Sequence, residues 1–244
     1  MSKLLVLYRA CGNESKREEF KPQRVPYFNK LKTWTSFING GFYNNANVDI
    51  KVIWDGPENL FSDYIKKFQN ITFVPVNYKS NKGSLGYCFD VIEQESKKYE
   101  FGAIIEEDHY YLPNSCNILF EGLYAFFPHF IALADHLDRY KLNNGDIIGT
   151  DGVFITKSTH WRTAESTVFS VSFPMNTFLK FKNDMVKYNN MGENAMHERD
   201  FFRYIISKSY RLFTPIPGMS THAVTNDLSP CTDWEKFVNS IVTL

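Results

Sequence analysis

Three acidic residues and a histidine, Glu106-Glu107-Asp108-His109, directly follow the apolar run 101–105. Adjacent carboxylates repel one another, and their pKa values rise unless a cation offsets the repulsion. A hard divalent ion such as Mg²⁺ or Mn²⁺ takes oxygen ligands, and two carboxylates with a substrate diphosphate form a typical site for it. Because alternate residues of an extended chain point the same way, Glu106 and Asp108 are expected to share one face. The alternative is a solvated acidic turn that leads into a helix.

A second acidic group, Glu198 and Asp200, opens a segment with helical spacing at 198–208. Acidic side chains in a first turn stabilise a helix through its dipole, which is the structural interpretation. An ordinary Asp or Glu is already ionised at pH 7, so either carboxylate could act as a base. The two residues lie two positions apart and do not share a helical face, so at most one is such a base. Asp151 is a reserve candidate.

The elements that must position these residues follow from the hydrophobic pattern. Strands are predicted at 4–8, 49–54, 71–76 and 101–105, and helices at 27–38, 60–68 and 87–98. This alternation predicts an α/β fold with a mostly parallel sheet and helices on both faces. Ligands bind beyond the carboxyl ends of the strands in such sheets, which is where the acidic triplet stands.

The second half of the chain is less regular. Strands are predicted within 146–157 and at 166–173, helices at 117–127, 176–188 and 198–208, and a loop at 214–223. Pro75 places the strand at 71–76 near a sheet edge or exit, because proline cannot donate a hydrogen bond to a neighbouring strand.

The composition excludes several classes of protein. The 244 residues include 27 Lys and Arg and 27 Asp and Glu, which give a net charge of zero, and 43% are hydrophobic. A disordered chain is excluded because it combines low hydrophobicity with high net charge. The zero net charge also argues against a dedicated nucleic-acid binder, because such a protein needs surplus basic residues to neutralise phosphates. Since no apolar run is long enough for a signal peptide or a membrane span, we expect a soluble, cytoplasmic protein.

The order of elements and the acidic triplet at 106–108 resemble the GT-A glycosyltransferases and their DxD motif. A fainter resemblance is to small soluble transferases encoded by large DNA viruses. The family implies a Rossmann-like, mostly parallel sheet in a single domain over 1–244, with a nucleotide-sugar-binding half (1–112) and a mixed acceptor-binding half (113–244). It also implies metal-dependent transfer from a nucleotide-diphosphate sugar, with UDP favoured, to a hydroxyl of a glycan or glycoprotein. Inversion of the anomeric carbon is favoured by the acids near residue 198.

The resemblance implies roles for the acidic residues. Asp108 would bind Mn²⁺ or Mg²⁺, Glu106 would face the sugar or the metal, and Glu107 would point away or give support. His222 would complete the metal ligands, since imidazole suits Mn²⁺. The chain departs from the family because Glu stands where the first Asp is usual, which leaves open whether Glu106 or Glu107 faces the site. Glu198 or Asp200 would be the catalytic base.

The donor nucleotide would contact residues near the ends of the first strands. Arg9 and Asn13 follow the first strand, where the family wraps the base and ribose. Asp55 ends the second strand and would bind a uracil imide, although an Asp before Gly-Pro is also a plain turn former. The segment Lys82-Gly83-Ser84 resembles the family's segment that packs on the nucleotide, while Ser84 alone could be a helix N-cap.

Three other functions stay open. A nucleotidyltransferase that makes the nucleotide sugar would share the architecture, but its dense Gly- and Arg-rich loop is reduced here to Gly12 and Arg17. A non-catalytic sugar-binding protein of the same fold would not need the acidic triplet. A glycosidase needs two carboxylates ~5 to 9.5 Å apart across a cleft, which adjacent acids do not guarantee. The Walker and Rossmann glycine fingerprints are absent from the sequence.

Overall fold

A computed structural model gives the structure of the protein and describes residues 3–12, 24–136, 140, 152–192, 196–226 and 228–243. The first part alternates strands and helices, as predicted. Its elements are β1 (Leu4–Cys11), α1 (Lys30–Asn39), β2 (Val48–Asp55), α2 (Leu60–Ile65), β3 (Ile71–Val76), α3 (Asn81–Glu95) and β4 (Phe101–Glu106). The strands β3, β2, β1 and β4 are adjacent in that order and parallel. The proline-containing β3 is an edge strand, which agrees with the expectation from Pro75.

The second part extends the same sheet with mixed directions. Its elements are β5 (His109–Tyr111), α4 (Ser115–Ala125), β6 (Phe130–Ile131), β7 (Val153–Ile155), β8 (His160–Ala164), β9 (Val171–Pro174), α5 (Met175–Met191), α6 (Glu198–Ser207), β10 (Leu212–Ile216), β11 (Ser220–His222) and α7 (Trp234–Ser240). The nine-stranded sheet continues from β4 through β9, β6, β10 and β8 to β7. Its β9 runs antiparallel to both β4 and β6, so the direction of the sheet changes there.

Two predictions for the second part are wrong. The segment 214–223, predicted as a loop, contains the end of β10 and all of β11. Pro215 and Pro217 hide the strand pattern, and β10 forms because β6 and β8 pair with it on either side. The strand predicted at 166–173 is confined to Val171–Pro174.

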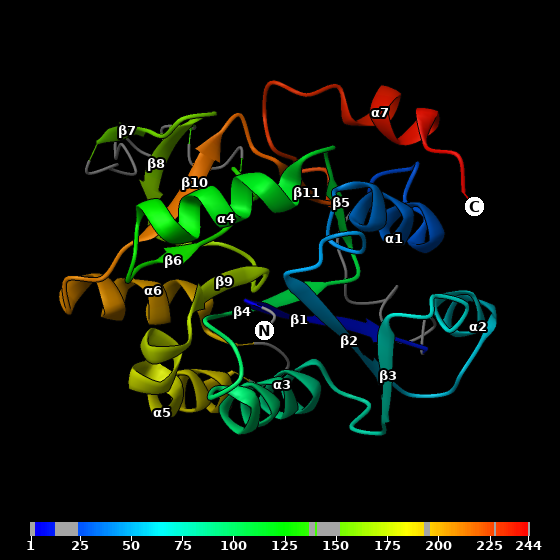
Figure 1. Ribbon diagram of the computed structural model, residues 1–244, viewed down its shortest axis with the longest axis horizontal. Coiled ribbons are helices and arrows are strands. Elements are labelled where there is room, and N and C mark those ends of the chain that lie inside the picture. The colour runs from blue at the N-terminus through cyan, green and yellow to red at the C-terminus, as the bar shows by residue number, and fades with distance from the viewer. Residues whose placement is uncertain are drawn as a thin grey trace.

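Every residue of β1 is buried, because helices cover both faces of the sheet. Leu4, Val6 and Tyr8 pack with side chains of α1, α2 and α4 on one face. Leu5 and Leu7 point to the other face and pack with α3, α5 and α6. Figure 1 shows α4 and α1 above the sheet and α3 and α5 below it. A run that is apolar at every position therefore lies between two layers of helices, as expected of a central parallel strand.

A small second sheet brings the end of the chain to the end of β4. Strand β5 follows β4 after a short turn, and β11 pairs with it in antiparallel register, His222 opposite His109. Helix α7 packs beside this sheet through Trp234 and Val238, which contact the cluster around Tyr110. None of the helices in the described ranges is long and apolar enough to cross a bilayer.

Candidate functional site

The carboxyl ends of β1 and β4 form the floor of a hollow. Parallel register places Arg9 beside Glu106 on the neighbouring strand. The empty space there is about 270 Å³, which includes space open to solvent. It is lined by Arg9, Ala10, Cys11, Ser84, Glu106, Glu107 and Asp108. The acidic triplet thus faces a cavity at the edge of the sheet where ligands of α/β proteins bind.

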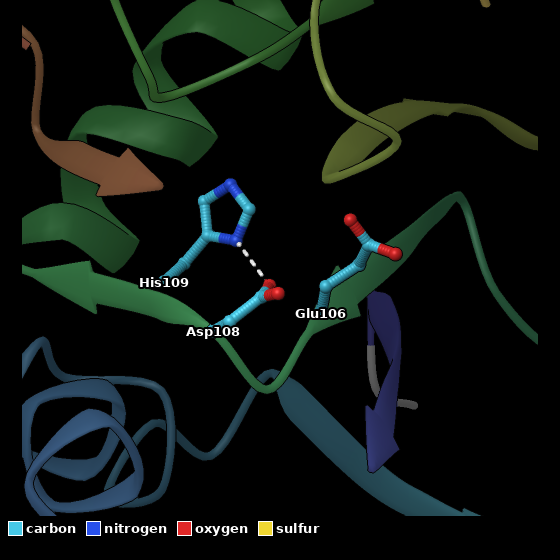
Figure 2. Close-up of side chains that lie close together, drawn as sticks. All are labelled: Glu106, Asp108 and His109. Carbon is cyan, nitrogen blue, oxygen red and sulfur yellow. Dashed lines mark ion pairs between the residues drawn. The ribbon is translucent and has the colours of Figure 1, made fainter. Parts of the chain in front are cut away.

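Glu106, Asp108 and His109 converge at this edge. A ligand atom from each of the three side chains lies within 4.8 Å of the other two. Figure 2 shows the three side chains on the same side of the chain, with Glu106 at the end of β4, Asp108 in the turn that follows and His109 at the start of β5. Two carboxylates and an imidazole are donors that suit Mn²⁺ or Mg²⁺. The turn, rather than a continuous strand, brings Glu106 and Asp108 to the same side.

Each acid of the triplet has its own basic partner, which the sequence analysis did not foresee. The partners come from β1, from α1 and from the segment before α1. The ion pairs are Arg9 Nη1–Glu106 Oε1 (3.2 Å), Lys30 Nζ–Glu107 Oε1 (3.3 Å) and Arg24 Nη2–Asp108 Oδ2 (2.9 Å). The repulsion between adjacent carboxylates is therefore offset by side chains of the protein itself.

Glu107 is buried and has a structural role that differs from that of its neighbours. Its side chain is buried and accepts hydrogen bonds from the Cys11 backbone N–H (3.1 Å) and the Cys11 thiol (3.3 Å). Lys30 Nζ also donates to the Cys11 carbonyl oxygen (3.0 Å). Glu107 therefore ties the end of β1 to the start of α1. Of the two glutamates, Glu106 is the one in the potential metal-binding cluster.

Two histidines close the other side of Asp108. The rings of His109 and His222 stack with centroids 5.1 Å apart, and His222 Nε2 lies 3.4 Å from Asp108 Oδ2. His109 Nδ1 lies 3.4 Å from Asp108 Oδ1 and 3.3 Å from Ser170 Oγ. Burial, with the nearby His222, lowers the pKa of His109 and favours the neutral imidazole that ligates metals. His109 Nε2 is buried without a hydrogen-bond partner within the described residues.

The segment predicted as a nucleotide-facing loop is the first turn of α3. Ser80, not Ser84, is the N-cap, because its side chain accepts the Gly83 N–H (3.0 Å). Ser84 is buried and accepts from Arg9 Nη2 (3.4 Å), so it lines the hollow. Lys82 Nζ donates to the carbonyl oxygens of Asn190 (3.1 Å) and Gly192 (3.4 Å) at the end of α5.

Gly83 is explained by packing alone. A Cβ atom at Gly83 would lie 2.7 Å from the Cβ of Tyr78 and 2.8 Å from Ser80 Oγ. Neither Lys82 nor Gly83 is among the residues that line the hollow. Of the three residues predicted in this segment, Ser84 is therefore the one that the fold brings to the site.

Asp55 holds a turn. Its carboxylate is buried and accepts the backbone N–H groups of Lys79 (2.9 Å) and Ser80 (3.2 Å), so it anchors the chain just before α3. This contact joins Asp55 to a distant segment and differs from the local Asp-Gly-Pro turn that the sequence analysis named as the alternative; binding of a base by Asp55 stays a prediction. Two other predicted residues, Asn13 and Asp151, lie outside the residues that the structure describes.

Glu198 and Asp200 occupy different environments on the first turn of α6. Glu198 is partly buried, and its pKa is raised to about 8, first by burial and then by the negative charge of Glu106. His222 and Arg9 act in the opposite direction on the same group, which places Glu198 within electrostatic reach of the acidic site. The Asp200 side chain is 55% exposed and pairs with His197 Nδ1 (3.3 Å). Burial and Glu106 thus raise the pKa of Glu198 above the ordinary value that the sequence analysis assumed.

Several residues of the site escaped the sequence analysis. Arg24 and Lys30 carry no motif, and each meets its partner only through the fold. Ser170 accepts the Glu106 backbone N–H (3.0 Å) from the segment before β9. His109 is adjacent to Asp108 in the sequence, so its position in the motif was the one available signal.

Comparisons with known proteins support the fold. No protein-family model matches the sequence, and no curated protein matches it. The structure of TarS from S. aureus is 11% identical over 87% of this chain and 35% of that chain, with a TM-score of 0.51. A nucleotide-diphospho-sugar transferase from Desulfovibrio desulfuricans G20 is 9% identical over 88% and 80%, with a TM-score of 0.48. A 4-diphosphocytidyl-2C-methyl-D-erythritol synthase is 13% identical over 98% and 97%, also with a TM-score of 0.48.

This chain therefore spans about a third of the length of TarS. At such low identity the likeness concerns the fold alone. It agrees with the α/β architecture predicted from the sequence, a central sheet flanked by helices on both faces.

Proposed function

We propose that this protein is a glycosyltransferase that moves a sugar from a nucleotide-diphosphate sugar, with UDP favoured, to a hydroxyl of a glycan or glycoprotein. The observation that carries the proposal is the convergence of Glu106, Asp108 and His109 within 4.8 Å at the carboxyl end of β4. His222, 3.4 Å from Asp108, lies beside them. The fold resembles that of TarS, and the acidic residues stand where α/β proteins bind their ligands.

Glu106, Asp108 and His109, with His222, would hold a divalent cation, Mn²⁺ or Mg²⁺. The donor set fits such a cation, because two carboxylates converge there with the His109 imidazole, whose Nδ1 faces Asp108 Oδ1 at 3.4 Å (Figure 2). A bound divalent cation would neutralise the charge that develops on a leaving diphosphate. Cys11, Arg9 and Ser84 line the hollow beside these residues and would contact the donor.

Glu198 is the better placed of the two candidate bases for an inverting transfer. It lies within electrostatic reach of Glu106 and His222, whereas Asp200 is more than half exposed and pairs with His197. Its carboxylate would accept the proton of the acceptor hydroxyl as that oxygen attacks the anomeric carbon. A base is most efficient when its pKa lies near the working pH, and burial moves the pKa of Glu198 in that direction.

Thermal unfolding with UDP, GDP, CMP and TDP, each with and without Mn²⁺, tests the proposal. A ligand at 100 times its dissociation constant adds about 2.7 kcal/mol of stability, which raises the melting temperature by about 5 to 10 °C at this length. We expect that shift with one nucleotide and only with Mn²⁺. No shift with any nucleotide would contradict the proposal and favour a non-catalytic sugar-binding protein. Release of pyrophosphate from a nucleoside triphosphate and a sugar phosphate would instead indicate a nucleotidyltransferase.

The Asp108→Asn variant tests the metal site directly. Loss of one ligand charge is expected to remove the Mn²⁺-dependent shift and to lower transfer by about 10²–10³-fold. The reason is that the bound cation would stabilise the negative charge that develops on the leaving diphosphate in the transition state. The matched control is Asp90→Asn, an exposed carboxylate of α3 that pairs with Lys182 (3.1 Å). Unchanged turnover in Asp108→Asn, with an intact fold by circular dichroism, would exclude this site.

A further inference from the structure

The acidic triplet is electrically balanced by the protein's own residues. Each carboxylate has a Lys or Arg partner at 2.9 to 3.3 Å, so these three positive side chains face three negative ones. A divalent cation among Glu106, Asp108 and His109 would add positive charge beside two of these basic groups. Like charges a few ångströms apart in a partly buried site repel strongly. Binding of the cation is therefore weakened while both basic side chains stay in place.

Arg9 and Lys30 are held in place by other contacts. The Arg9 side chain is 5% exposed, and besides Glu106 it donates to the side chains of Asn81 and Ser84. Lys30 is 13% exposed and donates to the Cys11 carbonyl oxygen. Its acidic partner is not in the potential metal-binding cluster. Neither side chain can leave without breaking hydrogen bonds that also hold the end of β1 and the start of α3.

Arg24 differs from both in its surroundings. Its partner Asp108 belongs to the cluster, and its side chain is 21% exposed, the most of the three. Arg24 Nη1 is buried without a hydrogen-bond partner among the residues described. The guanidinium lies over the ring of Phe28, 4.1 Å from its centroid, and the Arg24 backbone bridges to Val224 just after β11. These contacts hold the Arg24 backbone and the face of its guanidinium. Within the described residues, Asp108 is the carboxylate that pairs with this guanidinium.

We propose that Arg24 is an internal counter-cation that competes with the divalent cation for Asp108 and so sets the metal affinity of the site. The proposal rests on the metal site of the proposed function. In the metal-free protein Arg24 stabilises the buried Asp108 carboxylate. When the cation binds, Arg24 loses this contact and moves away from Asp108 Oδ2. Two ligands that compete for one group lower each other's affinity by the same factor.

Isothermal titration of EDTA-stripped protein with Mn²⁺ alone tests the competition. Arg24→Gln is expected to bind Mn²⁺ about tenfold more tightly than the unchanged protein, the middle of the range for coupled sites. Arg24→Lys keeps the positive charge and is expected to stay near the unchanged affinity. Lys51 on β2 pairs with Glu95 at the end of α3 (2.8 Å), away from the site. The control Lys51→Gln removes this pair and is expected to leave Mn²⁺ binding unchanged.

Thermal unfolding gives a second readout. In EDTA, Arg24→Gln is expected to melt below the unchanged protein, because Asp108 is left buried without its counter-cation. With saturating Mn²⁺ the two proteins are expected to melt at similar temperatures. If Arg24→Gln does not fold in EDTA, a Mn²⁺ titration followed by circular dichroism measures the same linkage. Failure to fold at saturating Mn²⁺ would overturn the proposal.

The outcomes separate this proposal from the proposed function. Equal Mn²⁺ affinity in the unchanged protein and Arg24→Gln would overturn the competition but leave the metal site standing. Absence of Mn²⁺ binding in both would overturn the metal site, and the competition with it. Binding that appears only in Arg24→Gln would support the competition and show that Arg24 closes the site in the unchanged protein.

Discussion

Glu106 at the end of β4 and Glu198 at the start of α6 interact electrostatically, but the charges of these two acidic regions are compensated differently. At the end of β4, three adjacent carboxylates each have a basic partner. At the start of α6, Glu198 is partly buried, with the negative charge of Glu106 acting on it, and its pKa is raised to about 8. The ionised forms of adjacent acids therefore need not be destabilised when basic partners are present, whereas the ionised form of a single acid can be.

The difference follows from the elements that meet at each place. The triplet lies where β1, α1 and the segment before α1 converge, and each of these supplies a basic residue. On Glu198, in the first turn of α6, the largest effect of another charged group comes from Glu106, which has the same sign. Charge compensation suits groups that bind a ligand in the ionised form. A raised pKa suits a group that exchanges a proton near neutral pH.

The largest expected effect is on transfer by variants of α6. Glu198→Gln is expected to lower turnover by about 10²–10⁴-fold, the usual contribution of a general base. Asp200→Asn, two residues along the same helix, is expected to retain turnover because its side chain is exposed and pairs with His197. Steady-state assays of both variants make the comparison. A reversed order, with Asp200→Asn inactive, would assign the base to the other face of α6.

The next effect is on stability at the end of β4. Glu107→Gln leaves Lys30 without its carboxylate, and breaking a buried ion pair of this kind costs about 3 kcal/mol. Urea unfolding would measure the change in the free energy of unfolding. The matched variant Glu93→Gln removes an exposed carboxylate that pairs with Lys182, and an exposed pair contributes less than about 1 kcal/mol. Equal losses in the two variants would contradict a buried, compensated Glu107.

The effect that is smallest per step is a pH dependence of stability in EDTA, which accumulates by about 1 kcal/mol per pH unit. Because the pKa of Glu198 is raised from 4.5 to about 8 on folding, the folded state binds the proton more tightly. Stability from this group is therefore full below pH about 4.5 and falls as pH rises towards about 8. The slope is at most about 1.4 kcal/mol per pH unit.

Glu198→Gln cannot ionise and isolates this contribution. Its free energy of unfolding, relative to the unchanged protein, is expected to rise between pH 5 and 8 by about 1 kcal/mol per unit and then to level off. Denaturant titrations at each pH give the difference. A constant difference over the whole range would mean that Glu198 titrates with an ordinary pKa in the folded protein.

Much of the parallel half of the fold could be predicted from local sequence. A strand buried on both faces is apolar at nearly every position, as in Leu4–Tyr8, and this pattern needs no partner to be recognised. The strand boundaries at 71–76 agree with those of β3. The short strands β6, β8 and β11 could not be predicted, because strands of two to five residues form only when neighbouring strands pair with them.

For the site, the sequence by itself determined that carboxylates would stand at the end of the fourth parallel strand. That follows from residue order alone, since Glu106 ends the apolar run. The tertiary structure decided that Glu106 and Asp108 join His109 in the potential metal-binding cluster, that His222 reaches Asp108 through the pairing of β5 with β11, and that the charge of Glu106 acts on Glu198. It also decided that Arg24 meets Asp108, 84 residues along the chain. Ion pairs and burial depend on distances between residues far apart in sequence, and only the packed chain sets those distances.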